Sequence, residues 1–533
     1  MKRKFWLPLL FAVIFIGGIW VGNSLNPIRR TKTVGEEKLL EVINLINTSY
    51  VDSVEIDSLV ELTIPTLLKY LDPHSAYIPA EQLQAANVEL DGKFSGIGIS
   101  FQILNDTLSV IEVISGGPAE KVGVLPGDRI LEVDGQDIAS QKITEQDVFS
   151  LLRGEKGTHV KITVKRTNSA KPIEFEIVRD DIPVESVDAA YMLEPGVGYI
   201  KVSRFARNTY NEFLQALYKL RVEGAENYVI DLRYNTGGYM EPAVMMANEF
   251  LSAGDIIVST RGANHKDDQI FQSDGIGAFQ ECGIAVLINE FTASASEIFS
   301  GAIQDNDRGW VIGRRSFGKG LVQHPVLLAD SSEVRLTVQR YYTPSGRCIQ
   351  KPYIPGDIVD YEAELANRFN NGESLSADSI KLHTEDQHLT VGGRSVYGGG
   401  GIMPDLFVPE DTSKITSYYI NVSNQNLLTK FAYEYCDLNR PELQKGKTVE
   451  ELVKLLPPDN VLLDSFVHYA SINGVPARWF YINISAPLIV NQLKALIARN
   501  ILGLSAYYEI INSTDKAVDE AAKHAPKPLT ADS

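Results

Sequence analysis

Residues 184–350 alternate apolar, strand-like runs with helical segments, and this alternation constrains the fold more than any other feature of the sequence. The strand-like runs lie at 196–205, 228–235, 256–260, 284–289 and 310–315. Helical spacing begins near Thr209, after Gly238 and near Ser294, and a hairpin-like run follows at 334–343. Strands that alternate with helices in this way predict an α/β core.

The regions that flank this core have other patterns, so we expect several domains in the 533 residues. Helical spacing of apolar residues predicts a helical region at 31–88, and short β-rich runs separated by glycine predict a β module at 89–180. We assign 181–410 to the core, with a polar insertion at 351–392, and 411–533 to a helical domain of unknown role. The predicted fold class is a mixed α+β and α/β multidomain protein.

Charge separates the beginning of the chain from the rest. The formal net charge is −18, but residues 1–35 hold six basic residues and no acidic one, so the remainder carries −24. A body this acidic repels phosphate, which argues against nucleic acid as a partner. Residues 5–22 carry no charge and follow three basic residues, which predicts at 1–30 a secretory signal or an uncleaved membrane anchor. We favour an anchor with the body on the periplasmic or extracytoplasmic side.

Several common catalytic signatures do not occur in the sequence. The eight histidines show no HExxH or HxH spacing, and the three cysteines are far apart. Neither a GxSxG elbow nor a Walker loop is found. We therefore expect no metal, nucleotide or organic cofactor.

Five small residues, three of them with hydroxyl groups, join the strand that ends at Asn289 to the next helix (TASAS, 292–296). One interpretation makes one of these hydroxyls the cap of the helix. The other makes one serine a nucleophile, whose oxyanion would face free amides and the positive end of the helix. A cap accounts for one hydroxyl and not for the whole run, so we favour the nucleophile.

A serine nucleophile needs a base. Lys319 stands between two glycines in FGKG, just before a strand, and a partly desolvated lysine there would have a lowered pKa and act as a neutral base. A solvated loop cation is the alternative for this residue. His324 is the rival base, although Pro325 follows it and no orienting carboxylate is near it in the sequence.

In a third segment, DLRYNTGG at 231–238, a hydrophobic strand meets a polar turn with two glycines. The carboxyl ends of strands are where open α/β sheets bind ligands, and a glycine there presents its N–H without a side chain in the way. A simple turn between strand and helix is the alternative.

Together these motifs resemble the carboxy-terminal processing peptidases, or tail-specific proteases, a serine/lysine peptidase family. The resemblance covers about residues 36–410. It rests on LDPHSAYI (71–78), FSGIGI (94–99), GGPAEKVGVLPGDRILEVDG (116–135), DLRYNTGG, TASASEI (292–298), FGKGLVQ (317–323), YYTPSGR (341–347) and GGGGIMPD (398–405). The resemblance implies that Ser294 is the nucleophile, Lys319 the base and Gln323 the residue that orients the lysine amine. The amides of Gly238 and Ala295 would form the oxyanion hole.

The β module resembles a PDZ domain, which binds an extended peptide tail at a strand edge and its terminal carboxylate at a glycine-rich loop. We expect Gly96, Ile97, Gly98 and Ile99 to form that loop. Because isoleucine alternates with glycine there, we expect substrates with an apolar terminal residue.

The resemblance implies a serine endopeptidase that cleaves flexible protein tails near their C-termini. Its partners would be proteins with exposed tails and, through 1–30, a membrane. The C-terminal helices would serve assembly or bind an adaptor. The alternative is a catalytically inactive, PDZ-bearing scaffold on a protease fold.

Overall fold

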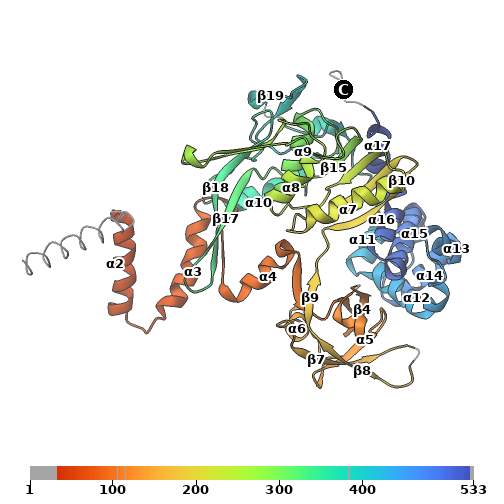
Figure 1. The fold of residues 1–533 in the computed structure, drawn as a ribbon. Coiled ribbons are helices and arrows are strands. Elements are labelled where there is room, and N and C mark those ends of the chain that lie inside the picture. The colour runs from red at the N-terminus through yellow and green to blue at the C-terminus, as the bar shows by residue number, and fades with distance from the viewer. Residues whose placement is uncertain (1–32, 105, 115, 168, 382–383, 528–533) are drawn as a thin grey trace, which may run out of the picture. The chain divides into compact units, whose positions relative to one another are not determined.

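The computed structural model describes residues 33–527 except 105, 115, 168 and 382–383 (Figure 1). The chain forms two units, Met1–Leu68 and Lys69–Ser533. The predicted membrane segment at 1–30 lies outside the described residues.

The first unit consists of two described helices, α2 (Val34–Ser49) and α3 (Ile56–Lys69, whose last residue belongs to the second unit). Thr33 and Glu36 start α2 with a capping box, in which each side chain accepts a hydrogen bond from the other's backbone amide. No residue of α2 is buried, and in α3 only Leu68 is.

A six-stranded sheet forms the core of the second unit, in the order β10-β11-β12-β15-β16-β21. Its strands are β10 (Val187–Glu194), β11 (Val197–Val202), β12 (Asn227–Asp231), β15 (Gly283–Ile288), β16 (Trp310–Gly313) and β21 (Leu406–Phe407). All neighbours are parallel except β10 and β11, and one row of paired residues runs Ile200, Ile230, Val286, Val311. The fold class predicted from the alternation is confirmed.

Helices cover both faces of this sheet. On one face, α7 (Thr209–Val222), α8 (Met240–Asn248) and α9 (Ala295–Asp305) pack around Phe213, Phe250 and Phe299. On the other face, α17 (Lys516–His524) buries Val518 and three alanines against β12, β15 and β16. Burial on two faces explains why the strands are apolar throughout rather than alternating.

A second, antiparallel sheet carries the segment after Lys319. Its order is β1-β18-β13-β14, with β17 also paired to β18. The strands are β1 (Ala76–Ile78), β13 (Ile256–Gly262), β14 (Gln269–Gln272), β17 (Leu321–Leu327) and β18 (Glu333–Tyr342). Because β18 pairs with β1 on one side and with β17 on the other, the segment around residue 75 is separated by one strand from the strand that begins after Gly320.

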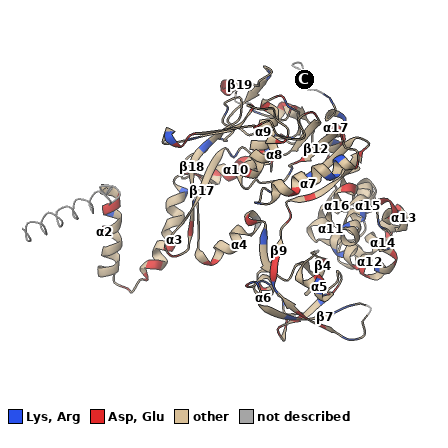
Figure 2. Ribbon diagram, in the orientation of Figure 1, with Lys and Arg blue, Asp and Glu red and all other residues tan. Residues whose placement is uncertain are grey.

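The β module has its own sheet, in the order β3-β4-β5-β7-β8, and its own apolar core. Its elements are β3 (Ile99–Leu104), β4 (Thr107–Val113), α5 (Pro118–Val122), β5 (Arg129–Val133), β6 (Gln136–Asp137), α6 (Glu145–Leu152), β7 (His159–Lys165) and β8 (Ile173–Val178). After α4 (Ala80–Asp91), the ladder between β2 (Lys93–Gly96) and β9 (Asp180–Pro183) joins the module to the core. Lys93 forms an ion pair with Asp181 there, where blue and red segments lie together at β9 in Figure 2.

The predicted insertion contains α10 (Ile358–Asn370) and leads to the small β19–β20 ladder (Gln387–Leu389, Ser395–Tyr397). Six helices then follow before α17: α11 (Ser417–Asn424), α12 (Leu427–Leu443), α13 (Val449–Leu455), α14 (Asp459–Ile472), α15 (Trp479–Leu502) and α16 (Leu504–Asn512). Most of them share one apolar core. Of the helices described, α15 is the one long and apolar enough to cross a membrane, but 44% of its apolar window is buried in this core.

Candidate active site

Ser294 lies between β15 and α9, at the position that caps the helix. Its backbone has φ 58° and ψ −117°, a region that non-glycine residues rarely adopt, at a cost of about 1–3 kcal/mol. Gly237 packs directly beneath it, since a Cβ at Gly237 would lie 2.7 Å from the Ser294 Cβ. A strained serine at a turn from strand to helix is how other hydrolases expose a nucleophile.

The amides predicted for the oxyanion hole have no protein acceptor in the described part of the chain. Ala295 is the first residue of α9, where helix geometry leaves the N–H without a partner. Gly238 lies beside Phe205, but the hydrogen bonds there use the groups on either side of it. The Phe205 amide donates to the Gly237 carbonyl, and the Tyr239 amide donates to the Phe205 carbonyl. Both N–H groups thus stay available for an anionic ligand.

The structure brings together Lys319 and Gln323, the pair that the family resemblance implies. The Lys319 Nζ donates to the Gln323 Oε1 over 3.0 Å. Burial lowers the pKa of Lys319, while the carboxylates of Glu297 and Asp72 act in the opposite direction and Arg335 reinforces the lowering. Burial thus favours the neutral amine, which is the form that can accept a proton.

The fully buried Glu297 links the serine and lysine segments, and sequence reasoning missed this role. Its Oε2 accepts from the amides of Ser294 (2.8 Å) and Lys319 (2.9 Å), and its Oε1 from the amide of Gly318 (2.8 Å) and the hydroxyl of Ser316 (2.5 Å). Burial raises the pKa of Glu297 to about 7, against these hydrogen bonds. Three of the four donors are backbone amides that cannot accept, so the site is complementary to the ionised carboxylate.

A second link is Tyr341, which is buried at the end of β18. Its hydroxyl lies 3.1 Å from the Ser294 carbonyl and 2.6 Å from that of Lys319. Burial raises the pKa of Tyr341 well above its ordinary value, so the phenol keeps its proton and donates it. Glu297 and Tyr341 therefore hold the two segments from the amide side and the carbonyl side.

The histidine at this site is not the one that the sequence suggested. His324 is exposed on β17 and has no ion pair within the described chain. His74 instead lies near Lys319, but burial and that lysine lower its pKa to about 4, with Asp72 acting in the opposite direction. Its Nε2 is already hydrogen-bonded to the Tyr361 hydroxyl at 2.7 Å, so His74 is a poor candidate for a general base.

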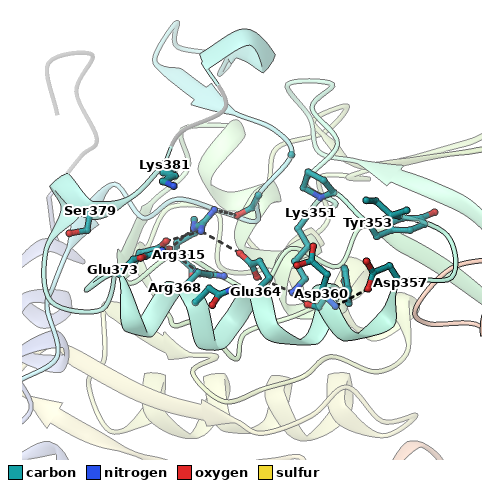
Figure 3. Close-up of a pocket in the computed structure, with 17 residues that line it drawn as sticks. Arg315, Lys351, Tyr353, Asp357, Asp360, Glu364, Arg368, Glu373, Ser379 and Lys381 are labelled. Atoms are coloured by element: carbon teal, nitrogen blue, oxygen red, sulfur yellow. Dashed lines mark hydrogen bonds and ion pairs between the residues drawn. The ribbon is translucent and has the colours of Figure 1, made fainter.

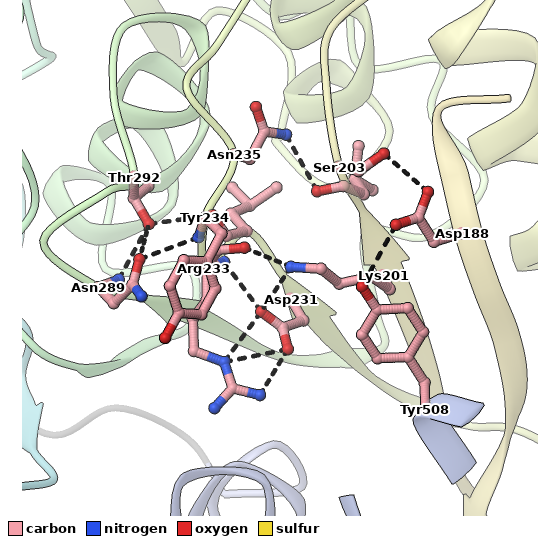
Figure 4. A network of polar contacts seen from close by, with 12 residues as sticks. Asp188, Lys201, Ser203, Asp231, Arg233, Tyr234, Asn235, Asn289, Thr292 and Tyr508 are labelled. Atoms are coloured by element: carbon pink, nitrogen blue, oxygen red, sulfur yellow. Dashed lines mark hydrogen bonds and ion pairs between the residues drawn. The ribbon is translucent and has the colours of Figure 1, made fainter. Parts of the chain in front are cut away.

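A buried polar network holds the strand end that leads into the oxyanion turn (Figure 4). Arg233 forms ion pairs with Asp231 (2.6 Å) and with Asp515 at the start of α17 (2.7 Å). The buried Lys201 donates to Asp231 and to the Arg233 carbonyl. Asp231 is buried, yet the two cations hold its pKa far below its usual range. The turn is thereby fixed from within the core and from α17.

The segment before Lys319 is held by the inserted helix α10. Arg368 donates to the carbonyls of Ser316 (3.0 Å) and Arg315 (2.8 Å). Glu373 accepts from both guanidinium groups, Arg315 at 2.6 Å and Arg368 at 3.0 Å. These groups line a cavity of about 440 Å³ beside α10 (Figure 3). Lys351 in the same lining forms an ion pair with Glu364, so the arginines and this lysine already have acidic partners.

An aromatic group surrounds Phe291, which follows the end of β15. Tyr234 stacks on Phe291 with ring centroids 5.4 Å apart, and Phe369 of α10 lies on it at 6.2 Å. Both partners are exposed. No group of histidine, cysteine or acidic side chains within the described residues is arranged to hold a metal ion.

In the β module, β3 is an edge strand because β4 is its one partner among the described strands. Gly96 ends β2, Gly98 has a positive φ of 80°, and Ile99 begins β3. Ile97 is buried in the module's core, and its carbonyl accepts from Ala119. Its side chain therefore cannot line a pocket for a substrate residue, which removes part of the argument for an apolar terminal residue. Phe101 and Phe149, 5.5 Å apart, lie instead between β3 and α6.

Comparison with known families gives three matches. Peptidase family S41 matches residues 196–360, and the PDZ domain matches 109–166. A family of unknown function, DUF8443, matches 418–503, which covers most of the helical region before α16. The first two matches agree with the core and the β module seen in the structure.

Individual relatives are matched over most of their length. The carboxy-terminal-processing protease of Bartonella bacilliformis is 36% identical over 413 residues, 75% of this chain and 92% of that protein. A probable CtpA-like serine protease of Staphylococcus aureus is 33% identical over 369 residues, 67% of this chain and 73% of that protein. A solved photosystem II D1 C-terminal processing protease is 25% identical and covers 72% of this chain and 95% of its own, with a TM-score of 0.35.

Proposed function

Since the chain belongs to peptidase family S41 and is a serine peptidase with a PDZ domain, we propose that Ser294 is its nucleophile and Lys319 its general base. The predicted family and enzyme class are confirmed, and the inactive scaffold is not favoured. The observation that carries the residue assignment is the strained backbone of Ser294 at the start of α9. This conformation turns Ser294 away from the direction of the strand, at the start of a helix whose first amide has no protein acceptor among the described residues.

The proposed reaction begins when Ser294 Oγ attacks the scissile carbonyl and its proton passes to the neutral Lys319 Nζ. The N–H groups of Gly238 and Ala295 hold the oxyanion that forms. The lysine ammonium then gives its proton to the leaving amine, and the peptide bond breaks to leave an acyl-enzyme. Water attacks the ester while Lys319 takes the water's proton, and Ser294 is released with the proton restored. Gln323 accepts a hydrogen bond from the lysine throughout and adds no charge.

The substrate of this reaction is a flexible protein tail. The open edge of β3 offers main-chain groups for an added strand, and the turn at 96–99 lies where a PDZ domain receives a terminal carboxylate. Relatives named for carboxy-terminal processing support the same substrate class. Gly96, Ile97, Gly98 and Ile99 would contribute backbone groups, with the side-chain preference set by Phe101 and Phe149.

Residues 1–30 anchor the protein in a membrane with the peptidase on the extracytoplasmic side. The support is the uncharged stretch at 5–22 behind three basic residues. Protease added to spheroplasts should digest the full-length protein from outside, and removal of 1–30 should release it from the membrane fraction. Protection from the added protease would contradict this placement.

Cleavage of β-casein, a flexible protein, tests the catalytic assignment. Ser294→Ala and Lys319→Ala should be inactive, and Gln323→Ala should retain only a small part of the rate. His324→Ala is the matched control, because this exposed histidine directly follows Gln323 in β17. Full activity of Lys319→Ala together with loss in His324→Ala would replace the lysine by the histidine as the base.

A further inference from the structure

The turn at 72–75 lies against the third member of the proposed catalytic group. The Nε2 of Gln323 donates to the carbonyl of His74, while its Oε1 accepts from Lys319. These two residues are separated by 249 positions in the chain. The sheet brings them together because β1, which follows the turn, and β17 both pair with β18.

This contact decides which way the Gln323 amide faces. A backbone carbonyl can only accept a hydrogen bond, so the NH₂ group of Gln323 must point to His74. The amide oxygen must then point to Lys319. In the reversed orientation the NH₂ group would oppose the lysine ammonium, or donate to the lone pair that the neutral amine needs for the serine proton.

Asp72 fixes the turn that presents this carbonyl. Its Oδ1 accepts from the amides of His74 and Ser75, each at 2.8 Å, and its Oδ2 from the Ser75 hydroxyl at 2.6 Å. Thr337, which pairs with Gln323 across the β17–β18 ladder, also donates to Asp72 at 3.0 Å. Burial raises the pKa of Asp72, but these hydrogen bonds outweigh it and keep the carboxyl ionised.

Tyr361 fixes the same turn from the other side. This buried residue of the inserted helix α10 binds the His74 Nε2 at 2.7 Å, and the two rings meet edge to face. Gln350 donates to the Tyr361 hydroxyl at 3.4 Å and accepts from the amide of Gly320, next to Lys319. The insertion thus contacts both the turn and the base segment.

We propose that the turn at 72–75, locked by Asp72 and by Tyr361 of α10, is a positioning element that sets Gln323, and through it Lys319, for catalysis. This inference rests on the proposed function. Neither Asp72 nor Tyr361 reaches the reacting atoms. Both position the Gln323 amide, and the charge of Asp72 also acts on the pKa of Lys319.

The charges around Lys319 predict the direction in which the pH–rate profile should shift. Glu297 of α9 and Asp72 favour the ammonium, Arg335 of β18 disfavours it, and His74 is neutral at working pH. Removing the charge of Asp72 therefore lowers the pKa of Lys319 further. The acid limb of the pH–rate profile should move to lower pH while the maximal rate falls.

The test measures kcat and KM of β-casein cleavage across the pH range in which Lys319 titrates. Asp72→Asn should lower kcat roughly 10²-fold, as a misplaced catalytic group does, with KM unchanged. Tyr361→Phe should lower kcat by roughly tenfold, the size of a lost supporting contact. In a Gln323→Ala background, neither change should lower kcat further, because both act through that amide. Asp330→Asn is the matched control. Asp330 also accepts hydrogen bonds from the amide and hydroxyl of one serine, Ser332 (3.0 and 2.7 Å), at the far end of the hairpin, and its loss should leave the profile unchanged.

Three results would overturn the positioning role: an unchanged kcat in Asp72→Asn, an equal fall with and without Gln323, or a fall that only follows loss of folded protein while the acid limb stays in place. If Ser294→Ala and Lys319→Ala are inactive in the same series, such a result removes this inference alone. Activity in Lys319→Ala would remove the proposed mechanism together with it.

Discussion

Replacing Gly237 by alanine tests whether the backbone beneath Ser294 is as closely fitted as the structure shows. An added Cβ would lie 2.7 Å from the Ser294 Cβ, 2.8 Å from the Ala293 carbonyl and 3.0 Å from the Ala295 amide. Two of these atoms belong to the nucleophile and to the proposed oxyanion hole. The substitution therefore presses on the catalytic geometry without removing any catalytic group.

The size of the effect follows from two contributions. Gly237 has a φ of 101°, and a left-handed backbone costs an L-residue about 1–2 kcal/mol. Overpacking adds about 1–3 kcal/mol. To reach an ordinary contact, the Ser294 Cβ must move from 2.7 Å to at least 3.4 Å. Since a misplacement of about 1 Å costs about 10²-fold in rate, we expect kcat to fall by between about tenfold and 10²-fold.

Gly224 supplies a matched control, because its φ is 102° and a Cβ there would meet nothing within 4 Å. Gly224→Ala should lose about 1–2 kcal/mol of stability and keep its kcat. The assay is β-casein cleavage under saturating substrate, with thermal denaturation of each variant to correct for the folded fraction. The reasoning is refuted if Gly237→Ala keeps a kcat within a factor of two of that of Gly224→Ala, a limit set by assay scatter of about 0.4 kcal/mol.

Three other substitutions address the contacts around the site. Tyr341→Phe removes the hydroxyl between the carbonyls of Ser294 and Lys319, and losing about one net hydrogen bond should lower kcat by about tenfold in steady-state assays. Lys319→Met should raise the thermal midpoint at neutral pH. The lowered pKa means that the unfolded chain binds more protons, so wild-type stability rises with pH towards the ordinary lysine value, and the variant should lack this rise. Asp515→Asn removes an ion pair with Arg233 and should cost about 1–3 kcal/mol, seen as faster hydrogen exchange in α17.

Each of these expectations has a clear contrary result. Wild-type kcat in Tyr341→Phe would mean that Glu297 alone holds the two segments. A lower thermal midpoint in Lys319→Met would mean that burial of the Lys319 amine does not destabilise the folded protein. Unchanged exchange in α17 after Asp515→Asn would mean that the apolar contacts of Val518 fix this helix without the ion pair.

The parts of the site that the sequence predicts are those encoded locally. The run of small residues between a strand and a helix predicted a serine nucleophile there, and the family resemblance selected Ser294 and implied that Gln323 lies beside Lys319. Glu297 was also within reach, since serine and glutamate three residues apart at a helix start form the spacing of a capping box. The contact between Glu297 and Lys319, which lies 22 residues further along the chain, could not be predicted from this local spacing.

The remaining residues depend on contacts that local pattern does not encode. His74 meets Tyr361 across 287 positions and Gln323 across 249. These meetings follow from which strands flank β18, and single-sequence periodicity does not reveal strand order. The same limit applies to α17. Its helical pattern is readable in the sequence, but its place on the core sheet is fixed by the apolar face it shares with β15 and β16.

The place of α17 sets an order of events during synthesis. The strands it covers are complete at Gly313, whereas α17 begins at Lys516, 203 residues later. At roughly 5–20 residues per second, the ribosome needs about 10–40 s to make that interval. For that time the part of the central sheet that α17 covers lacks this helix, and the Arg233 side chain has no Asp515 to bind. In a nascent chain the turn that carries Ser294 can therefore form before α17 is made. The peptidase core is fully packed only after α17 has been synthesised and has docked on the sheet.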